Sequence, residues 1–155
     1  MGTSQYKFRA IVIDDVDFCR ELLAEFLEGR GYQVLTFPDV TSCPLFSASD
    51  PHCPQQAACT DFLLLDNLMP HMTGLDFLEL QQQSNCLLQV AGKAIFSANW
   101  TPAGLARAAQ LGCKSFHKPY DFEKLGAWLD DQEKRCSPDR VLAEIENVMG
   151  GKKTS

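Results

Sequence analysis

Five side chains with oxygen or nitrogen groups stand at the ends of short apolar runs of the sequence. They are Asp14, Asp15, Asp66, Ser97 and Lys118. Three carboxylates brought together repel one another unless a cation joins them, and oxygen ligands of this kind suit Mg²⁺. Mg²⁺ can hold a phosphoryl oxygen, while an ammonium neutralises a second oxygen and a hydroxyl donates to a third. Because a carboxylate in line with a phosphoryl donor can act as nucleophile, the five residues predict an aspartyl-phosphate site.

These side chains can meet only if the apolar runs form neighbouring parallel strands. The expected strands cover residues 8–13, 32–37, 61–65, 93–97 and 113–117. Apolar residues at helical spacing follow them, and Thr73, Thr101 and Asp121 are placed to cap three of these helices. Strands that alternate with helices predict an α/β fold with a five-stranded parallel sheet covered on both faces. Ligands of such sheets bind at the carboxyl ends of the strands, where the five residues would converge.

The segment 41–60 is irregular and contains three prolines, which argue against one continuous helix. It also holds Cys43, His52, Cys53 and Cys59, but their spacing matches no common zinc pattern, so a zinc site is the less favoured hypothesis. The seven cysteines include no CxxC pair and follow no secretion signal, which indicates free thiols in a reducing compartment.

The 155 residues predict one domain over 8–135, preceded by an extension at 1–7 and followed by a helix and tail at 136–155. The last helix is expected to begin at Ser137-Pro138, and its apolar face is expected to pack on its own domain, with pairing to a partner or a second copy as the less favoured alternative. Only 155 − 135 = 20 residues follow Arg135, too few for an output domain, so we expect a single-domain protein or a piece of a longer one.

Charge and hydropathy exclude some classes of function. With 14 Lys plus Arg against 20 Asp plus Glu, the net charge of −6 disfavours direct binding to nucleic acid. No apolar run approaches the ~18 residues of a membrane span, and the first residues lack an apolar signal core. We therefore expect a cytoplasmic protein without membrane insertion.

Over about residues 8–135 the sequence resembles the receiver domain of two-component response regulators. The resemblance rests on the apolar run and acidic pair at 11–15, the run DNLMPHMTG at 66–74, the run IFSA at 95–98 and the HKP at 117–119. It implies a doubly wound, flavodoxin-like (CheY-like) fold, here with an extra C-terminal helix.

The same resemblance implies a role for each site residue. Asp66 would be the phosphoacceptor, with Lys118 and Ser97 as the other catalytic side chains. Mg²⁺, with Mn²⁺ as an alternative ion, would be held by Asp14, Asp15, Asp66 and the backbone carbonyl of Leu68.

Two further features follow from the resemblance. Ser97 would be the switch hydroxyl, and the Lys118–Pro119 peptide bond would be cis. The family's switch aromatic usually lies three residues before the lysine, where this chain has Ser115, so we expect Phe116 to serve instead.

The implied function is a phosphorylation-controlled switch in a bacterial two-component system. A sensor histidine kinase or phosphotransfer protein would be the donor, and a downstream protein would be the target of a monomer or weak dimer. The protein would be no enzyme beyond its own phosphoryl transfer and dephosphorylation.

The sequence leaves two alternative functions. A phosphorylation-independent interaction module could keep the fold, but such a module would be expected to lack one of the five site residues. A hydrolytic phosphatase with an aspartyl intermediate commonly carries a second Asp two residues after the nucleophile, where this chain has Leu68.

Overall fold

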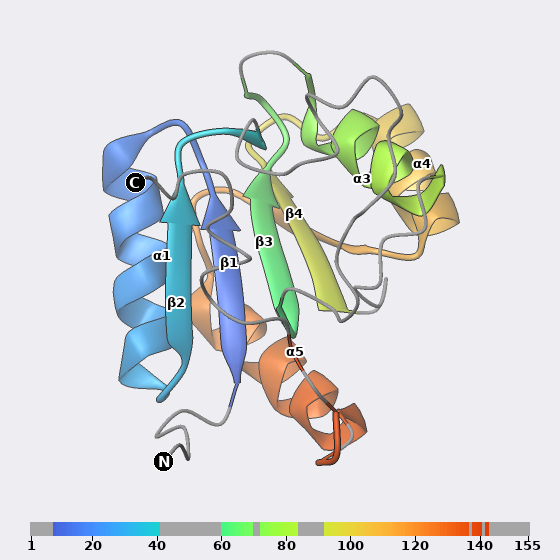
Figure 1. Ribbon diagram of the computed structural model, residues 1–155. Helices are drawn as coiled ribbons and strands as arrows, with labels where there is room; N and C mark the ends of the chain where they lie inside the picture. The colour runs from blue at the N-terminus through green and yellow to red at the C-terminus, as the bar shows by residue number, and fades with distance from the viewer. Residues whose placement is uncertain are drawn as a thin grey trace, which may run out of the picture.

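The computed structural model describes residues 8–40, 60–69, 72–83, 92–136, 138–140 and 142, and Figure 1 shows its arrangement. One parallel sheet has the order β2-β1-β3-β4-β5, with β1 (Arg9–Ile13), β2 (Gln33–Phe37), β3 (Phe62–Asp66), β4 (Lys93–Ser97) and β5 (Lys114–His117). The helices of the described ranges are α1 (Asp17–Gly29), α3 (Gly74–Gln83), α4 (Pro102–Leu111) and α5 (Phe122–Arg135). The predicted fold class, with a five-stranded parallel sheet, is confirmed. The candidate zinc ligands of 41–60 lie outside the described residues.

Two apolar layers enclose the sheet, one on each face (Figure 1). On one face α1 and α5 pack on the strands through Leu23, Leu27, Leu125, Leu129, Val12, Leu64 and Phe96. On the other face α3 and α4 pack through Leu75, Leu78, Ala108, Ile13, Leu65 and Ile95. Because successive strand residues point to opposite faces, a strand covered on both faces reads as a continuous apolar run, as β3 does from Phe62 to Leu65.

The predicted caps fix where the helices begin. The Thr101 side chain accepts from the Gly104 N–H at 2.9 Å, and the Asp121 carboxylate accepts from the first turn of α5. Gly112 ends α4 with a φ of 82°, a left-handed conformation that costs glycine little. No helix among the described ranges is long and apolar enough to cross a membrane.

The chain beyond α5 differs from expectation. Pro138 and Asp139 form a turn and Leu142 lies in an isolated β-bridge, so the described part of the expected helix is not helical; residues 143–155 lie outside the described ranges. A long-range ion pair instead holds this segment against the sheet. The Asp61 carboxylate, next to the amino end of β3, is paired with the Arg140 guanidinium through both of its oxygens.

Asp61 is closely held at the amino end of the sheet. Its Oδ2 accepts from the Arg140 Nη2 at 2.9 Å and from the Arg9 backbone N–H at 2.9 Å. The Arg140 guanidinium also lies 5.0 Å from the centre of the Phe8 ring. The segment after α5 is therefore fastened to the end of the sheet opposite the five candidate site residues.

We predict that Arg140→Ala lowers the free energy of unfolding by about 3 kcal/mol, because it leaves the carboxylate of Asp61, whose side chain is only 2% exposed, without its cation. Chemical denaturation measures the change. Arg135→Ala is the matched control, since Arg135 pairs with Asp131 where both side chains are more than half exposed, and it should cost less than about 0.5 kcal/mol. Equal effects of the two substitutions would contradict the role of the buried pair.

Candidate functional site

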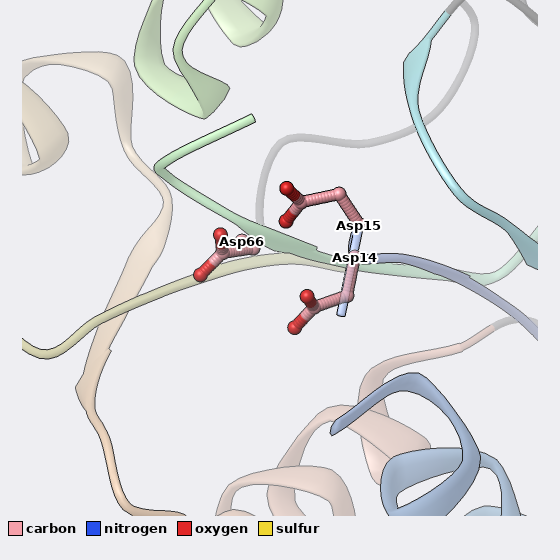
Figure 2. A group of neighbouring side chains, drawn as sticks. All are labelled: Asp14, Asp15 and Asp66. Carbon is pink, nitrogen blue, oxygen red and sulfur yellow. The ribbon is translucent and has the colours of Figure 1, made fainter. Parts of the chain in front are cut away.

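The parallel strands bring the predicted site residues to one end of the sheet. Asp14 follows β1, Asp66 and Ser97 are the last residues of β3 and β4, and Lys118 follows β5. The register agrees, since Asp66 lies beside Phe96 on β4. Figure 2 shows the side chains of Asp14, Asp15 and Asp66 gathered at this end. The convergence follows from the fold: in a parallel sheet all carboxyl ends meet on the same side.

The three aspartates form a cluster that suits a divalent cation. Each offers a carboxylate oxygen, and these oxygens lie within 4.8 Å of one another. Asp14 and Asp66 are buried, whereas Asp15 is exposed. Three oxygen donors of like charge at this spacing fit Mg²⁺, which takes one or two carboxylates and keeps several waters. Leu68 follows in the loop with its side chain 58% exposed, and its carbonyl as a further ligand stays a prediction.

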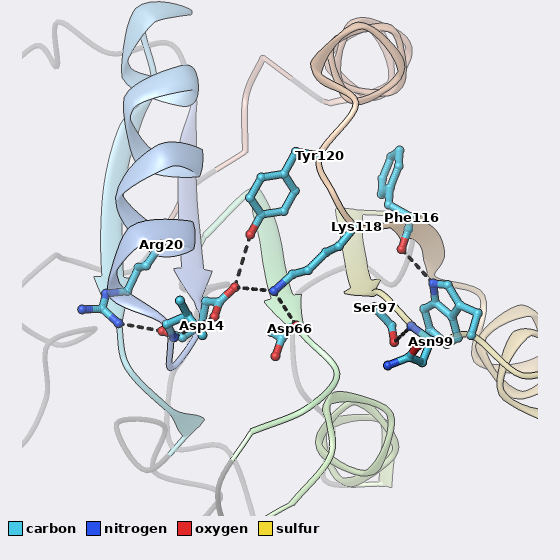
Figure 3. Close-up of polar contacts among 10 residues, drawn as sticks. Asp14, Arg20, Asp66, Ser97, Asn99, Phe116, Lys118 and Tyr120 are labelled. Carbon is cyan, nitrogen blue, oxygen red and sulfur yellow. Dashed lines mark hydrogen bonds and ion pairs between the residues drawn. The ribbon is translucent and has the colours of Figure 1, made fainter.

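Lys118 is the cation that touches this cluster. Its Nζ lies 2.8 Å from Asp66 Oδ1 and 3.1 Å from Asp14 Oδ2 (Figure 3). Burial alone would lower the pKa of Lys118, but the hydrogen bonds to Asp66 and Asp14 outweigh it, so its pKa is raised. The ammonium is therefore permanent at neutral pH, and it neutralises one of the three carboxylates.

Asp66 is held in an environment that on balance disfavours its charge. Burial raises the pKa of Asp66, the Lys118 hydrogen bond lowers it, and the charges of Asp14 and Asp15 raise it again. The net pKa is above the ordinary value for an aspartate. The carboxylate is thus a group that a cation or a covalent bond at the same place would stabilise.

The loop after β3 fixes the direction of Asp66. The Asn67 N–H donates to the Phe96 carbonyl at 2.9 Å, and the Asn67 carbonyl accepts from the Gly74 N–H at 2.9 Å. A Cβ on Gly74 would stand 2.8 Å from the Asp66 carbonyl oxygen and 2.7 Å from the Ile95 side chain. This close approach explains why a glycine stands where α3 begins.

Ser97 joins the site through the backbone of β5. The Lys118 N–H donates to the Ser97 carbonyl at 3.0 Å, and the Ser97 Oγ accepts from the Asn99 N–H at 3.1 Å. Because that oxygen is accepting, the hydroxyl proton is available to another acceptor. The Lys118–Pro119 peptide bond is cis, as expected.

Phe116 does not join the site residues. It lies opposite Phe96, and their rings stack with centroids 5.2 Å apart in the layer under α1 and α5. Ser97 points to the same face of the sheet as Ile95 and Ser115, because side chains alternate along a strand. This is the face opposite to that of Phe116. What Phe116 offers toward the β4–α4 loop is its carbonyl, which accepts from the Trp100 indole N–H at 2.7 Å.

Two contacts of Asp14 extend the site beyond the expected residues. The Tyr120 hydroxyl donates to Asp14 Oδ2 at 3.2 Å, and the Arg20 Nη1 donates to the Asp14 carbonyl at 2.6 Å. No signal in the sequence marks Tyr120. Burial and the neighbouring Asp14 and Cys19 raise the pKa of Tyr120, so its hydroxyl stays protonated and remains a donor.

A doubly wound α/β domain with a cluster of three aspartates and a lysine at the carboxyl ends of its strands is thus defined. Residues 10–130 match the family model described as the response regulator receiver domain. The chain belongs to the response regulator receiver domain family.

Individual proteins agree with this assignment. The two-component response regulator ARR9 of Arabidopsis thaliana is 24% identical over 159 residues, which cover 94% of this chain and 68% of that protein. The structure of the Vibrio cholerae chemotaxis protein CheY4 is 21% identical, with a TM-score of 0.60 over 80% of this chain and 97% of that one. The receiver domain of the Francisella response regulator 1452 is 18% identical, with a TM-score of 0.66 over 83% of this chain and 98% of that one. These structures share the fold.

We predict that Asp66→Asn raises the thermal unfolding midpoint at pH 7 when no divalent cation is present. A carboxyl group with a raised pKa in the folded state stabilises the fold below its unfolded-state pKa and loses that contribution as the pH rises through the folded-state pKa. The neutral amide avoids this loss, so the gap between the variant and the parent should widen from mildly acidic to neutral pH.

Asp76→Asn is the matched control, because a hydrogen bond from Arg107 lowers the pKa of Asp76. This substitution should lower the midpoint slightly, since the pair is solvent-exposed and such pairs contribute about 0–1 kcal/mol. If Asp66→Asn destabilised the protein as Asp76→Asn does, the account of the acidic cluster would be wrong.

Proposed function

We propose that the protein accepts a phosphoryl group on Asp66 from a phosphohistidine protein or a small phosphodonor, and that this modification changes its affinity for a downstream protein. The observation that carries the proposal is the Lys118 ammonium 2.8 Å from the Asp66 carboxylate, inside a cluster of three carboxylates. This arrangement gives a nucleophile, a fixed positive charge and a cation site within one cluster of side chains.

The chemistry divides among the chain's own residues. An Asp66 carboxylate oxygen attacks the phosphorus, a new P–O bond forms, and the bond to the leaving group breaks with its electron pair going to that group. Lys118 stays close to both the nucleophile and the incoming oxygens and neutralises charge that develops on them. The Ser97 hydroxyl, whose proton is available, would donate to a phosphoryl oxygen. A bound Mg²⁺ supplies further charge neutralisation for these oxygens, and Asp14 and Asp15 would hold it with Asp66.

Trp100 is the aromatic residue that we expect to carry the change outward, in place of Phe116. Phosphorylation replaces the single carboxylate charge of Asp66 by a phosphoryl group that carries about −1.5 to −2, and this group would draw the Ser97 hydroxyl and the loop that follows it. That loop is tied to β5 by the Trp100 indole bond to the Phe116 carbonyl. A shift of Ser97 would therefore reach α4 and β5, a two-state change that a covalent group biases.

The proposed setting is a cytoplasmic two-component pathway. A sensor histidine kinase or phosphotransfer protein would supply the phosphoryl group, and a protein target would respond to the phosphorylated form. We propose no reaction on other substrates, so the turnover of its own acyl phosphate would be the protein's only catalysis. A phosphorylation-independent interaction module is the competing function.

The direct test is the intact mass of the protein after incubation with Mg²⁺ and acetyl phosphate. We expect a gain of one phosphoryl group in the parent and none in Asp66→Asn, because the amide is no nucleophile toward phosphorus. The same incubation without divalent cation should give little product, since two carboxylate charges then remain uncompensated beside the incoming phosphate.

Asp76→Asn is the control for the loss of a carboxylate outside the site, because Asp76 lies on α3 and pairs with Arg107 rather than with Lys118. It should be phosphorylated like the parent. If neither acetyl phosphate nor a histidine kinase modified a correctly folded parent, the phosphorylation-independent module would be favoured.

The two tryptophans allow a test of the outward step. In ¹H–¹⁵N NMR spectra, the indole N–H resonance of Trp100 should shift on phosphorylation because its acceptor lies on β5. The indole resonance of Trp128, whose ring packs against Phe62 and Phe116, should change much less. A larger response at Trp128 than at Trp100 would contradict the proposed route.

A further inference from the structure

Tyr120 contacts the acidic cluster although it is neither a carboxylate nor part of the sequence runs on which the resemblance rests. It stands two residues after Lys118, and its hydroxyl donates to Asp14 Oδ2 at 3.2 Å (Figure 3). The same oxygen accepts from the Lys118 Nζ at 3.1 Å. Asp14 Oδ2 therefore has two donors, one charged and one neutral.

The ring of Tyr120 is fixed before any ligand arrives. It meets the Phe96 ring edge-on, with centroids 5.2 Å apart and an interplanar angle of 89°. It also lies 5.7 Å from the Phe122 ring, and the Lys118 ammonium stands 5.8 Å from its centre. Aromatic packing of this kind leaves the hydroxyl little freedom, so its hydrogen bond imposes a direction on Asp14 rather than following it.

The other contacts of Asp14 show what that direction achieves. Its Oδ1 accepts from the Val16 N–H at 2.9 Å. A carboxylate has about four lone-pair sites, and the contacts to Val16, Lys118 and Tyr120 occupy three of them. The remaining lone pair is on Oδ1 of Asp14, and Asp14 forms the cluster with Asp15 and Asp66.

We infer that Tyr120 is a positioning residue for the cation site: by holding Asp14 Oδ2, its hydroxyl keeps the Asp14 carboxylate oriented for a divalent cation shared with Asp15 and Asp66. Groups that hydrogen-bond to metal ligands orient them, and removing such a group typically costs 10–100-fold in metal affinity or activity. The inference deepens the proposed function, on which it rests for the identity of the site.

The test is Tyr120→Phe, which removes the hydroxyl and keeps the packed ring. Calorimetric titration with MgCl₂ should give a dissociation constant about tenfold higher than in the parent. In phosphorylation by acetyl phosphate, the Mg²⁺ concentration for half-maximal rate should rise by the same factor, while the rate at saturating Mg²⁺ falls much less. A purely structural role would not split the two quantities in this way.

Tyr32→Phe is the matched control. The Tyr32 hydroxyl also donates to a carboxylate, that of Glu133, but this pair joins the region after α1 to α5, away from the acidic cluster. It should lower stability and leave the Mg²⁺ dissociation constant unchanged. A dissociation constant for Tyr120→Phe within twofold of the parent, or below it, would overturn the inference. So would a loss confined to the saturating rate.

The calorimetric arm uses no phosphoryl donor. It therefore remains decisive if Asp66 proves not to be phosphorylated, and the two proposals can fail separately.

Discussion

Mutual repulsion among three carboxylates is the constraint on which the rest of this structure depends. Asp14, Asp15 and Asp66 place oxygens within 4.8 Å of one another, and Lys118 supplies one compensating charge. Charges at such separations in partly buried surroundings interact strongly, so the folded protein holds a site that a cation would stabilise. The neighbouring negative charges of Asp14 and Asp15 also contribute to the raised pKa of Asp66.

The architecture tolerates this imbalance because apolar packing elsewhere holds the strands in place. Both faces of the sheet are covered, and the central strands β1, β3 and β4 are buried along most of their length. Asp66 cannot move away from Asp14, since each ends or follows a strand locked into the ladder. At the opposite end of the sheet, the buried Asp61 carboxylate is paired with the Arg140 guanidinium. At the functional end, by contrast, the Lys118 ammonium is shared between two buried carboxylates, those of Asp14 and Asp66.

Much of this could be predicted from the sequence, for a simple reason. Apolar runs that stop at a polar residue mark strand ends, and a parallel sheet gathers those ends on one side. The proximity of Asp66 and Lys118 could therefore be predicted from the sequence. Other features depend on side-chain direction or on distant pairing. The alternation of side chains along β5 places Phe116 on the face of the sheet away from Ser97. The apolar pattern predicts that β5 is a strand but not which face Phe116 occupies. Arg140 and Asp61 are 79 positions apart, and no local pattern joins them. Tyr120 reaches Asp14 only through packing on aromatic neighbours.

The central claim is that the acidic cluster is a cation site whose repulsion a divalent ion relieves. It is tested most directly by following the thermal unfolding of the unmodified protein through a titration with MgCl₂, against NaCl at equal ionic strength. The account predicts that stability rises with the logarithm of the Mg²⁺ concentration above the dissociation constant, by about 2.7 kcal/mol at 100 times that constant. Equal curves in the two salts would contradict it.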